Sequence, residues 1–460
     1  MAQRNDRMGA FDAVLYGIEG DPLLRSGIIA FIVLDGPPDR EKVTERAERL
    51  TRLFPRLRER AVGNSLSPAP PRWETDPNFD PGYHVRWRRL PRGADDIPAA
   101  LAYAARMGDQ DFDHSRPLWE IAILTDLADG RAAVIYKVHH SVADGMGGLA
   151  MSASLFDLES DPGDLGPMPP APVADPAGLI DRFVQAAAFE AAALQETAVG
   201  AARAYVHAAR GLLTSPIDTT VSGVRTAAAF AAMIAPPGGP KSEWMSDRSL
   251  TCAFNMIEVP LEPITRAARA AGVTLNIVFV AAVADAFGTY HRRNGHALSE
   301  FRVNMPVNQR TPADAVTGNH WVPARFVLPT DDVDATARLA QLHGLIEDAR
   351  QDPALELSEV LYKAMALLPA ALTERLAAAL MKGVDVAATN VPGPPVGVYL
   401  CGAKVLALVP FAPKAGAAIN IGLLTYDGSV LLGINSDPAA VRDPDEFAAC
   451  LEEAFAKYAV

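Results

Sequence analysis

The sequence predicts an α/β protein with two domains. At 460 residues the chain is longer than one hydrophobic core usually serves, and 49% of the residues are hydrophobic, enough for two cores. Strand-like and helix-like apolar patterns alternate over residues 1–156 and again over 245–460. Residues 157–244 between them contain an acidic, proline-rich linker (157–176) and a long alanine-rich helix. We therefore expect an N-terminal domain, a connecting segment and a C-terminal domain with these boundaries.

The first domain is expected to open with a buried strand, because residues 27–34 (GIIAFIVL) are continuously apolar. A helix follows at 40–54, where apolar residues recur at helical spacing. The further elements that the pattern predicts are a strand around Trp73, a strand at 83–90, a helix at 97–107, a hairpin of 120–124 and 132–138 around Asp129-Gly130, and a helix at 146–156.

The connecting helix is predicted from about residue 180 to 208. Its apolar stripe includes Ile180, Val184, Ala187 and Ala191, and it is expected to pack on the body of the protein or, as an alternative, to face lipid. The second domain is predicted to contain strands at 251–259, 302–306 and 321–328, helices at 263–271, 276–290 and 446–458, an extended segment at 388–395, and a hairpin of 417–425 and 429–435.

Charge and cysteine content restrict the function classes. The net charge of −13 and the lack of a basic stripe argue against nucleic-acid binding. The three cysteines are widely separated, which favours a reducing compartment without disulfides. No apolar run reaches 18 residues and no signal-peptide pattern follows the N-terminus, so a cytoplasmic protein without a membrane span is expected.

The most informative motif is His139-His140-Ser141-Val142-Ala143-Asp144-Gly145, which follows the predicted strand 132–138. Side chains alternate along a strand, so His139 and His140 cannot both face the same space. One imidazole is then a candidate general base and the other a supporting group. Asp144 is interpreted as a structural anion that pairs with an arginine, and Gly145 as a position of close backbone approach.

Two other interpretations of the motif, a chance match and a metal site, are weaker. The four fixed positions would match by chance in only roughly one chain in a thousand of this length. A metal site would need further ligands, but the other histidines and cysteines form no cluster at zinc-like spacing, so no metal is expected. A serine nucleophile in a G-x-S-x-G turn is also absent near the motif, which disfavours a covalent acyl-enzyme.

Several segments together resemble the bacterial bifunctional wax ester synthase/diacylglycerol acyltransferases of the chloramphenicol-acetyltransferase-like superfamily. The motif HHSVADG is similar to the superfamily's histidine motif. The other matching segments occur in the family's order: Pro117-Leu118-Trp119-Glu120, Met305-Pro306-Val307-Asn308-Gln309-Arg310, Thr389-Asn390-Val391-Pro392-Gly393-Pro394 and Tyr426-Asp427-Gly428. One departure is Asn276-Ile277, where the family usually has Asn-Asp.

The resemblance implies two acetyltransferase-like domains with mixed sheets and an active site at their interface. It implies transfer of a long-chain acyl group from acyl-CoA to diacylglycerol or a fatty alcohol, with His140 as the base and no cofactor. Pro117, Leu118, Trp119, Asn276 and Arg310 would line or support the substrate channel, and Arg310 is a candidate partner for Asp144. The alternatives are a condensation-type enzyme with a carrier-protein donor and a silent lipid carrier.

The substrates of such an enzyme also suggest where it works. Diacylglycerol and fatty alcohols reside in bilayers, and the products are insoluble. We therefore expect a cytoplasmic protein that binds peripherally to the inner face of the membrane or to lipid droplets. Because the net charge is negative, exposed apolar surface rather than attraction to anionic lipid should provide the attachment.

Overall fold

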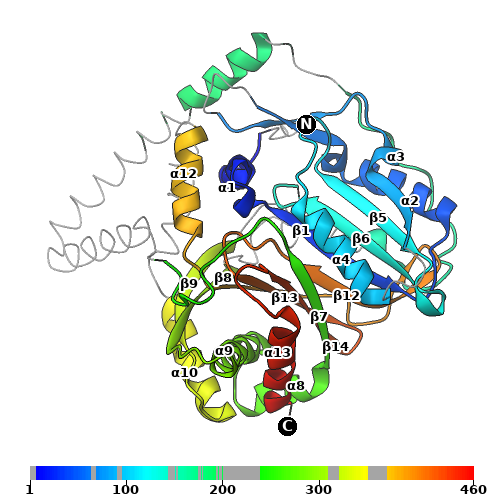
Figure 1. Cartoon of the computed structure of the whole chain (residues 1–460). Helices are drawn as coiled ribbons and strands as arrows, with labels where there is room; N and C mark the ends of the chain where they lie inside the picture. The colour runs from blue at the N-terminus through cyan, green and yellow to red at the C-terminus, as the bar shows by residue number, and fades with distance from the viewer. Residues whose placement is uncertain are drawn as a thin grey trace, which may run out of the picture.

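The computed structural model describes residues 7–63, 69–90, 96–142, 154–174, 180–192, 239–308, 321–350 and 370–459, with a few single positions between them. Two six-stranded mixed sheets dominate this part of the chain, and each has its own hydrophobic core (Figure 1). The predicted fold class, an α/β protein with two mixed sheets, is confirmed.

The first sheet is built mainly from the N-terminal third of the chain. Antiparallel pairing joins β12 to β1, β1 to β6 and β6 to β5, and β4 adds in parallel at the edge. In sheet order the strands are β11 (Tyr399–Leu400), β12 (Ala403–Phe411), β1 (Gly27–Leu34), β6 (Ala132–His139), β5 (Trp119–Thr125) and β4 (Val85–Arg89). The predicted hairpin of β5 and β6 is therefore present.

The second sheet comes from the C-terminal half. Its central strand β10 is parallel to both neighbours, and the other pairs are antiparallel. In order the strands are β7 (Ala253–Pro260), β14 (Ser429–Ser436), β13 (Ile419–Tyr426), β10 (Val386–Val391), β8 (Glu300–Asn308) and β9 (Trp321–Pro329). A separate two-stranded sheet pairs β2 (Glu59–Val62) with β3 (Arg72–Thr75).

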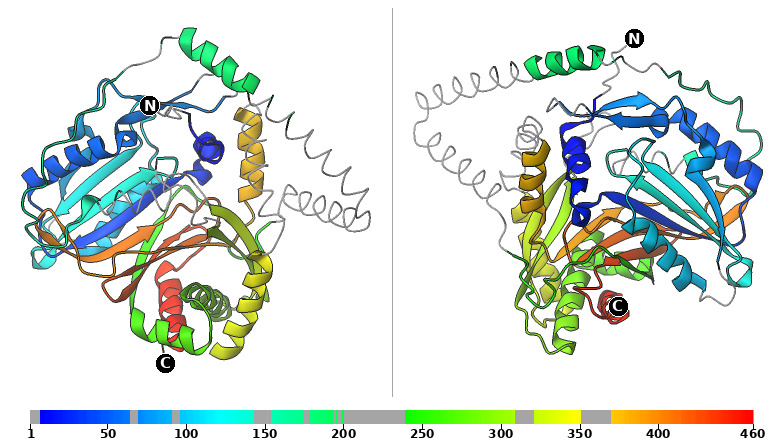
Figure 2. Two further views of the ribbon diagram at one scale, coloured as in Figure 1. Left: turned by 180° about the vertical axis from the view of Figure 1, so that it is seen from behind. Right: turned by 45° about the horizontal axis from the view of Figure 1, so that its top comes forward.

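Helices pack against both sheets, as Figures 1 and 2 show. Those of the first half are α1 (Ala10–Gly17), α2 (Arg40–Leu53), α3 (Pro81–His84) and α4 (Asp96–Asp109), with the short 3-10 turns η1 (Ile18–Gly20), η2 (Pro22–Leu24), η3 (Pro55–Arg58) and η4 (Ala128–Gly130). Those of the second half are α8 (Leu261–Ala270), α9 (Leu275–Arg293), α10 (Ala335–Arg350), α12 (Ala370–Met381) and α13 (Pro444–Tyr458).

Helix α9 is the predicted buried helix. Its residues from Ile277 to Gly288 are all buried, as expected for a helix that is apolar on every side. Its one acidic residue, Asp285, is matched by the Arg338 guanidinium at 3.1 Å, the Lys457 ammonium at 2.9 Å and the Tyr458 hydroxyl at 2.7 Å. Three partners make a buried carboxylate tolerable in this core.

The order of the strands shows that the two sheets do not coincide with the expected ranges 1–156 and 245–460. Strands β11 and β12 belong to the range 245–460 but pair in the first sheet, where β12 is hydrogen-bonded to β1. The chain therefore crosses from the second sheet to the first and back. Hydrogen-bonded strands cannot be separated without exposing their backbone groups, so the two halves are joined by more than the linker.

One element boundary differs from the expectation, and the linker has contacts that the sequence did not predict. The strand predicted at 83–90 begins only at Val85, because Asp80 caps α3 and Pro81 starts that helix. The proline-rich linker is anchored: its Asp157 forms a buried ion pair with Arg46 of α2 at 2.7 Å. Backbone oxygens further along it accept hydrogen bonds from Arg49 and Arg52 of α2.

The connecting helix presents a different face to the protein from the one predicted. It is described at residues 180–192, and the rest of the predicted range lies mostly outside the described residues. Ile180 and Val184, which the pattern placed on the packed stripe, are 77% and 62% exposed, and Ala186 is buried instead. Arg182 is on the packed side, where it binds Glu74 at 2.7 Å. A charge pair, rather than the apolar stripe, therefore orients the helix.

No single helix among the described residues has the length and apolar character needed to cross a membrane. Helices α8 and α9 meet those criteria only as a pair, with a bend of 102° between them.

Candidate active site

The two motif histidines lie at the end of β6 in different environments. His139 is the last residue of the strand and is inaccessible to solvent, whereas His140 follows it and is half-buried. The backbone N–H of His140 donates to the Ser26 carbonyl oxygen at 3.0 Å, and that of His139 donates to the Leu118 oxygen at 2.9 Å. The backbones of both residues are thus held by the residues that immediately precede β1 and β5.

Hydrogen bonds fix the tautomer of His139. The backbone N–H of Ser141 donates to its Nδ1 at 3.0 Å, and the Ser141 hydroxyl lies 2.6 Å from the same atom. A backbone N–H can only donate, so Nδ1 accepts and the proton of the neutral ring is on Nε2. That nitrogen lies 3.1 Å from Oε1 of Glu19.

Glu19 is a buried carboxylate on η1 that sequence reasoning missed. It is 7% exposed, and its Oε1 also accepts a hydrogen bond from the Ser26 N–H at 2.8 Å. Burial by itself raises the pKa of Glu19, but the interactions with His139, Ser26 and His114 outweigh it and lower the pKa below the usual range. Glu19 is therefore ionised at neutral pH.

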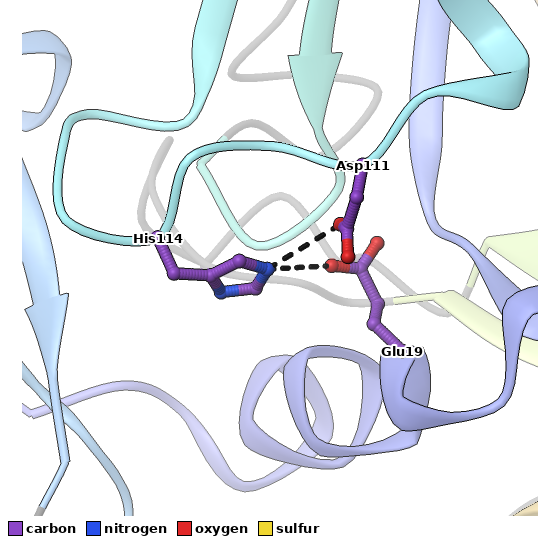
Figure 3. Close-up of side chains that lie close together, drawn as sticks. All are labelled: Glu19, Asp111 and His114. Atoms are coloured by element: carbon purple, nitrogen blue, oxygen red, sulfur yellow. Dashed lines mark hydrogen bonds and ion pairs between the residues drawn. The ribbon is translucent and has the colours of Figure 1, made fainter.

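A second histidine approaches the other oxygen of Glu19. Nε2 of His114 lies 3.7 Å from Oε2 of Glu19 and 3.4 Å from Oδ1 of Asp111, as Figure 3 shows. Its Nδ1 is 3.0 Å from the hydroxyl of Tyr16 on α1. Within the described part of the chain, Glu19, Asp111 and His114 are the group whose spacing could hold a metal ion.

The histidine end of the first sheet lies close to the second half of the chain. Helix α1 and turn η1 pack against α12, and Asp21 is paired with Lys382 at 2.5 Å. A pocket opens between the halves beside Gly27, the register partner of His139. Its lining includes Arg25 and Asp109 from the first half and Cys252 and Lys414 from the second.

The Pro117-Leu118-Trp119 segment is part of the core. All three side chains are buried, and the Trp119 indole N–H donates to the Leu57 oxygen at 2.8 Å. The ring of His84 stacks on Trp119 with centroids 4.4 Å apart. The segment supports the site through the bond from His139 to Leu118, and none of its side chains is free for chemistry.

Asn276, on α9, contacts two of the matching segments, which lie on β8 and β10 of the second sheet. Its Nδ2 lies 3.6 Å from the sulfur of Met305, and its Oδ1 lies 3.5 Å from Nδ2 of Asn390. Ile277 is 3% exposed in the core around α9, so this departure from the family pattern fills an apolar position.

The remaining predicted residues cannot be placed. Asp144 and Gly145 fall within 143–150 and Arg310 within 309–320, outside the described residues. Their assigned roles, including a pair between Asp144 and Arg310, stay predictions.

A mixed-sheet α/β molecule with a histidine pair at a strand end near the junction of its halves has the arrangement of chloramphenicol-acetyltransferase-like acyltransferases. Structures of this fold match nearly the whole chain. The wax ester synthase/diacylglycerol acyltransferase of Marinobacter aquaeolei has a TM-score of 0.64 at 21% identity and covers 98% of both chains. The first condensation domain of the CDA synthetase has a TM-score of 0.56 at 20% identity and covers 99% of this chain and 96% of its own.

Sequence comparisons specify the family. Residues 8–279 match the model of the wax ester synthase/diacylglycerol acyltransferase catalytic domain, and 317–458 match that of its C-terminal domain. A Mycobacterium tuberculosis protein named as a diacylglycerol O-acyltransferase is 32% identical over 98% of this chain and 91% of its own length. Another from that organism is 28% identical over 93% and 90%. The chain belongs to the wax ester synthase/diacylglycerol acyltransferase family and is an acyltransferase.

Proposed function

We propose that this acyltransferase moves a long-chain acyl group from acyl-CoA to the hydroxyl of diacylglycerol or of a fatty alcohol, with His140 as general base. The observation that carries the proposal is the position of His140: it is half-buried, its backbone N–H is bound by Ser26 just before β1, and it adjoins the fully buried His139. A base that is held rigidly but remains reachable suits proton transfer from a bound hydroxyl.

The proposed reaction is a direct transfer. His140 takes the proton of the acceptor hydroxyl while its oxygen attacks the thioester carbonyl. The tetrahedral oxyanion then collapses, the carbon–sulfur bond breaks, and the coenzyme A thiolate leaves with the proton from the imidazolium. General-base catalysis contributes about 10²- to 10⁴-fold, and positioning of the two substrates supplies most of the rest.

The cysteines support a mechanism without an acyl-enzyme. Burial raises the pKa of Cys252 to about 12 and that of Cys401 to about 11, and burial also raises the pKa of Cys450. Thiols protonated at neutral pH are poor nucleophiles. No cofactor is required in this scheme.

The direct test follows release of free coenzyme A thiol from palmitoyl-CoA with diacylglycerol, hexadecanol or no acceptor. We expect release that depends on an acceptor and that falls at least about a hundredfold in His140→Ala, with acyl-CoA binding and the melting temperature nearly unchanged. Retention of more than about a tenth of the rate in His140→Ala would refute the assigned base. Activity with an acyl carrier protein thioester alone would favour the condensation-type alternative.

We further propose peripheral attachment to the inner face of the membrane or to lipid droplets in the cytoplasm. Large apolar side chains are exposed on segment 180–192 and on α12: Ile180 (77%), Val184 (62%), Leu372 (45%) and Leu376 (42%). Both helices lie at the end of the molecule away from the C-terminus (Figure 2). An exposed apolar surface of this kind can enter the headgroup region of a bilayer that holds the acceptor.

A further inference from the structure

We propose that Glu19 is a positioning residue for acyl transfer, acting on His140 through His139 and Ser26. The proposal rests on the role of His140 given above. It starts from one atom, Oε1 of Glu19, which lies 3.1 Å from Nε2 of His139 and accepts the Ser26 N–H at 2.8 Å. These two contacts reach the last residue of β6, which His140 follows, and Ser26, whose carbonyl oxygen accepts the N–H of His140.

The first route runs through the backbone of Ser26, the residue just before β1. Glu19 fixes the N–H of Ser26, and the carbonyl oxygen of the same residue accepts the N–H of His140 at 3.0 Å. The carboxylate is therefore two hydrogen bonds away from the backbone of the base. A shift of Ser26 moves His140 by a similar amount, and a displacement of about 1 Å in a catalytic group can cost about a hundredfold in rate.

The second route runs through the ring of His139. Because Nδ1 accepts from Ser141, the Nε2 proton faces the carboxylate of Glu19, which favours the same tautomer. The ring thus connects Glu19 to the turn just after His140. A glutamine at position 19 would have similar size, but it would lack the negative charge and one acceptor oxygen.

The charged and titratable groups that face Glu19 come from every element around it. They are Tyr16 on α1, Asp111 and His114 on the loop before β5, Lys137 and His139 on β6, and, beyond η1, the Asp21–Lys382 pair with α12. Of these, His139 is the group in contact with Glu19 that also adjoins the base. A negative charge near an imidazole favours its protonated form, so we expect that removing the Glu19 charge lets His140 lose its proton at lower pH.

The test compares wild type with Glu19→Gln in the palmitoyl-CoA assay. We expect kcat to fall about 10- to 100-fold, by analogy with removal of the group that orients a metal-ligating histidine, with KM for acyl-CoA within about twofold. The acidic limb of the kcat profile should move to lower pH. Glu19→Asp, which keeps the charge, should retain the wild-type acidic limb even if its rate is reduced.

The matched control is Glu74→Gln, which removes another buried carboxylate, 6% exposed and paired with Arg182. It should lower the melting temperature without moving the pH profile. An equal fall in kcat in both variants would make the effect of Glu19 merely structural and overturn the proposal. Loss of wild-type activity in EDTA with recovery in zinc would also overturn it, since the Glu19–Asp111–His114 group would then be a metal site.

Measurements in the His140→Ala variant separate the proposal for Glu19 from the assignment of His140 as the base. If His140 is the base and Glu19 acts through it, adding Glu19→Gln to His140→Ala should lower the residual rate by less than about twofold. If His140→Ala keeps its activity, the proposed base is wrong. If His140→Ala is inactive and Glu19→Gln has wild-type kcat and pH profile, only the role of Glu19 fails.

Discussion

His139 has contacts on both ring nitrogens, with Ser141 at Nδ1 and Glu19 at Nε2, and no solvent exposure. Sequence reasoning predicts a smaller loss of turnover for His139→Ala than for His140→Ala. The structure adds an effect on stability, because the variant leaves the buried carboxylate of Glu19 without its imidazole partner. Removing one member of a buried polar pair costs about 3–5 kcal/mol.

We therefore expect His139→Ala to lower the free energy of unfolding by about 3 kcal/mol in urea titrations. His140→Ala, at a half-buried position, serves as its control and should change the unfolding free energy by less than about 1 kcal/mol. Equal unfolding curves for His139→Ala and wild type would show that the His139 ring does not stabilise the buried carboxylate of Glu19.

At the scale of elements, His84 joins α3 to β5. Its Nδ1 lies 2.7 Å from the Trp119 oxygen, its ring stacks on the Trp119 indole, and it is fully buried. Burial lowers the pKa of His84 from 6.5 to about 4. Between pH 6.5 and about pH 4, His84 is protonated in the unfolded chain but neutral in the folded protein. The stabilising contribution is thus complete above pH 6.5 and is lost as the pH falls toward 4.

This shift predicts a loss of about 2 kcal/mol of unfolding free energy between pH 7 and pH 5. His84→Phe keeps an aromatic ring for the stack but cannot titrate. Its unfolding free energy should fall less than that of wild type over the same interval, in parallel urea titrations. An identical pH dependence in the two proteins would mean that His84 titrates normally and that α3 does not shield it.

At the scale of the whole molecule, the two sheets meet where β12 crosses β13 and β14. Gly422 and Gly433 are register partners there, and a Cβ on Gly422 would lie 2.6 Å from the Pro410 carbonyl oxygen. A Cβ on Gly433 would overlap the same oxygen even more closely. Glycine is needed at both positions because the backbone of the other sheet occupies the side-chain space.

Gly433→Ala should therefore lower the unfolding free energy by about 2 kcal/mol or more, since Pro410 belongs to a strand paired on its other side and cannot simply retreat. The control is Gly344→Ala in α10, where nothing lies within 4 Å and alanine should stabilise the helix by up to about 1 kcal/mol. Wild-type stability of Gly433→Ala in a denaturant titration would show that the sheets can separate without cost.

Attachment to lipid is also a property of the whole molecule. With a net charge of −13, binding to phosphatidylcholine vesicles should survive about 1 M salt, where the Debye length is about 3 Å, and should yield to mild detergent. The double variant Ile180→Ser, Val184→Ser should bind less in flotation assays. Leu53→Ser, at a 50% exposed position on α2, should bind as wild type does. Wild-type protein that stays entirely unbound at low salt would contradict the proposal.

The sequence by itself determined the elements that local patterns specify. The apolar run of β1, the hairpin of β5 and β6, and the all-apolar helix α9 follow from the periodicity of neighbouring residues. The motif around His140 and the other short segments also predicted the acyltransferase family, because each is contiguous in the chain. Such local patterns can be recognised from neighbouring residues without knowledge of how the rest of the chain folds.

Tertiary structure alone decided which distant residues meet. Glu19 and His139 are separated by 120 positions, and no spacing rule links a carboxylate on a 3-10 turn to a histidine at a strand end. The crossing of β12 into the first sheet and the exposed side of segment 180–192 were equally hidden. Such contacts depend on how whole elements pack, and the free energy of packing is shared among many residues that no local stretch contains.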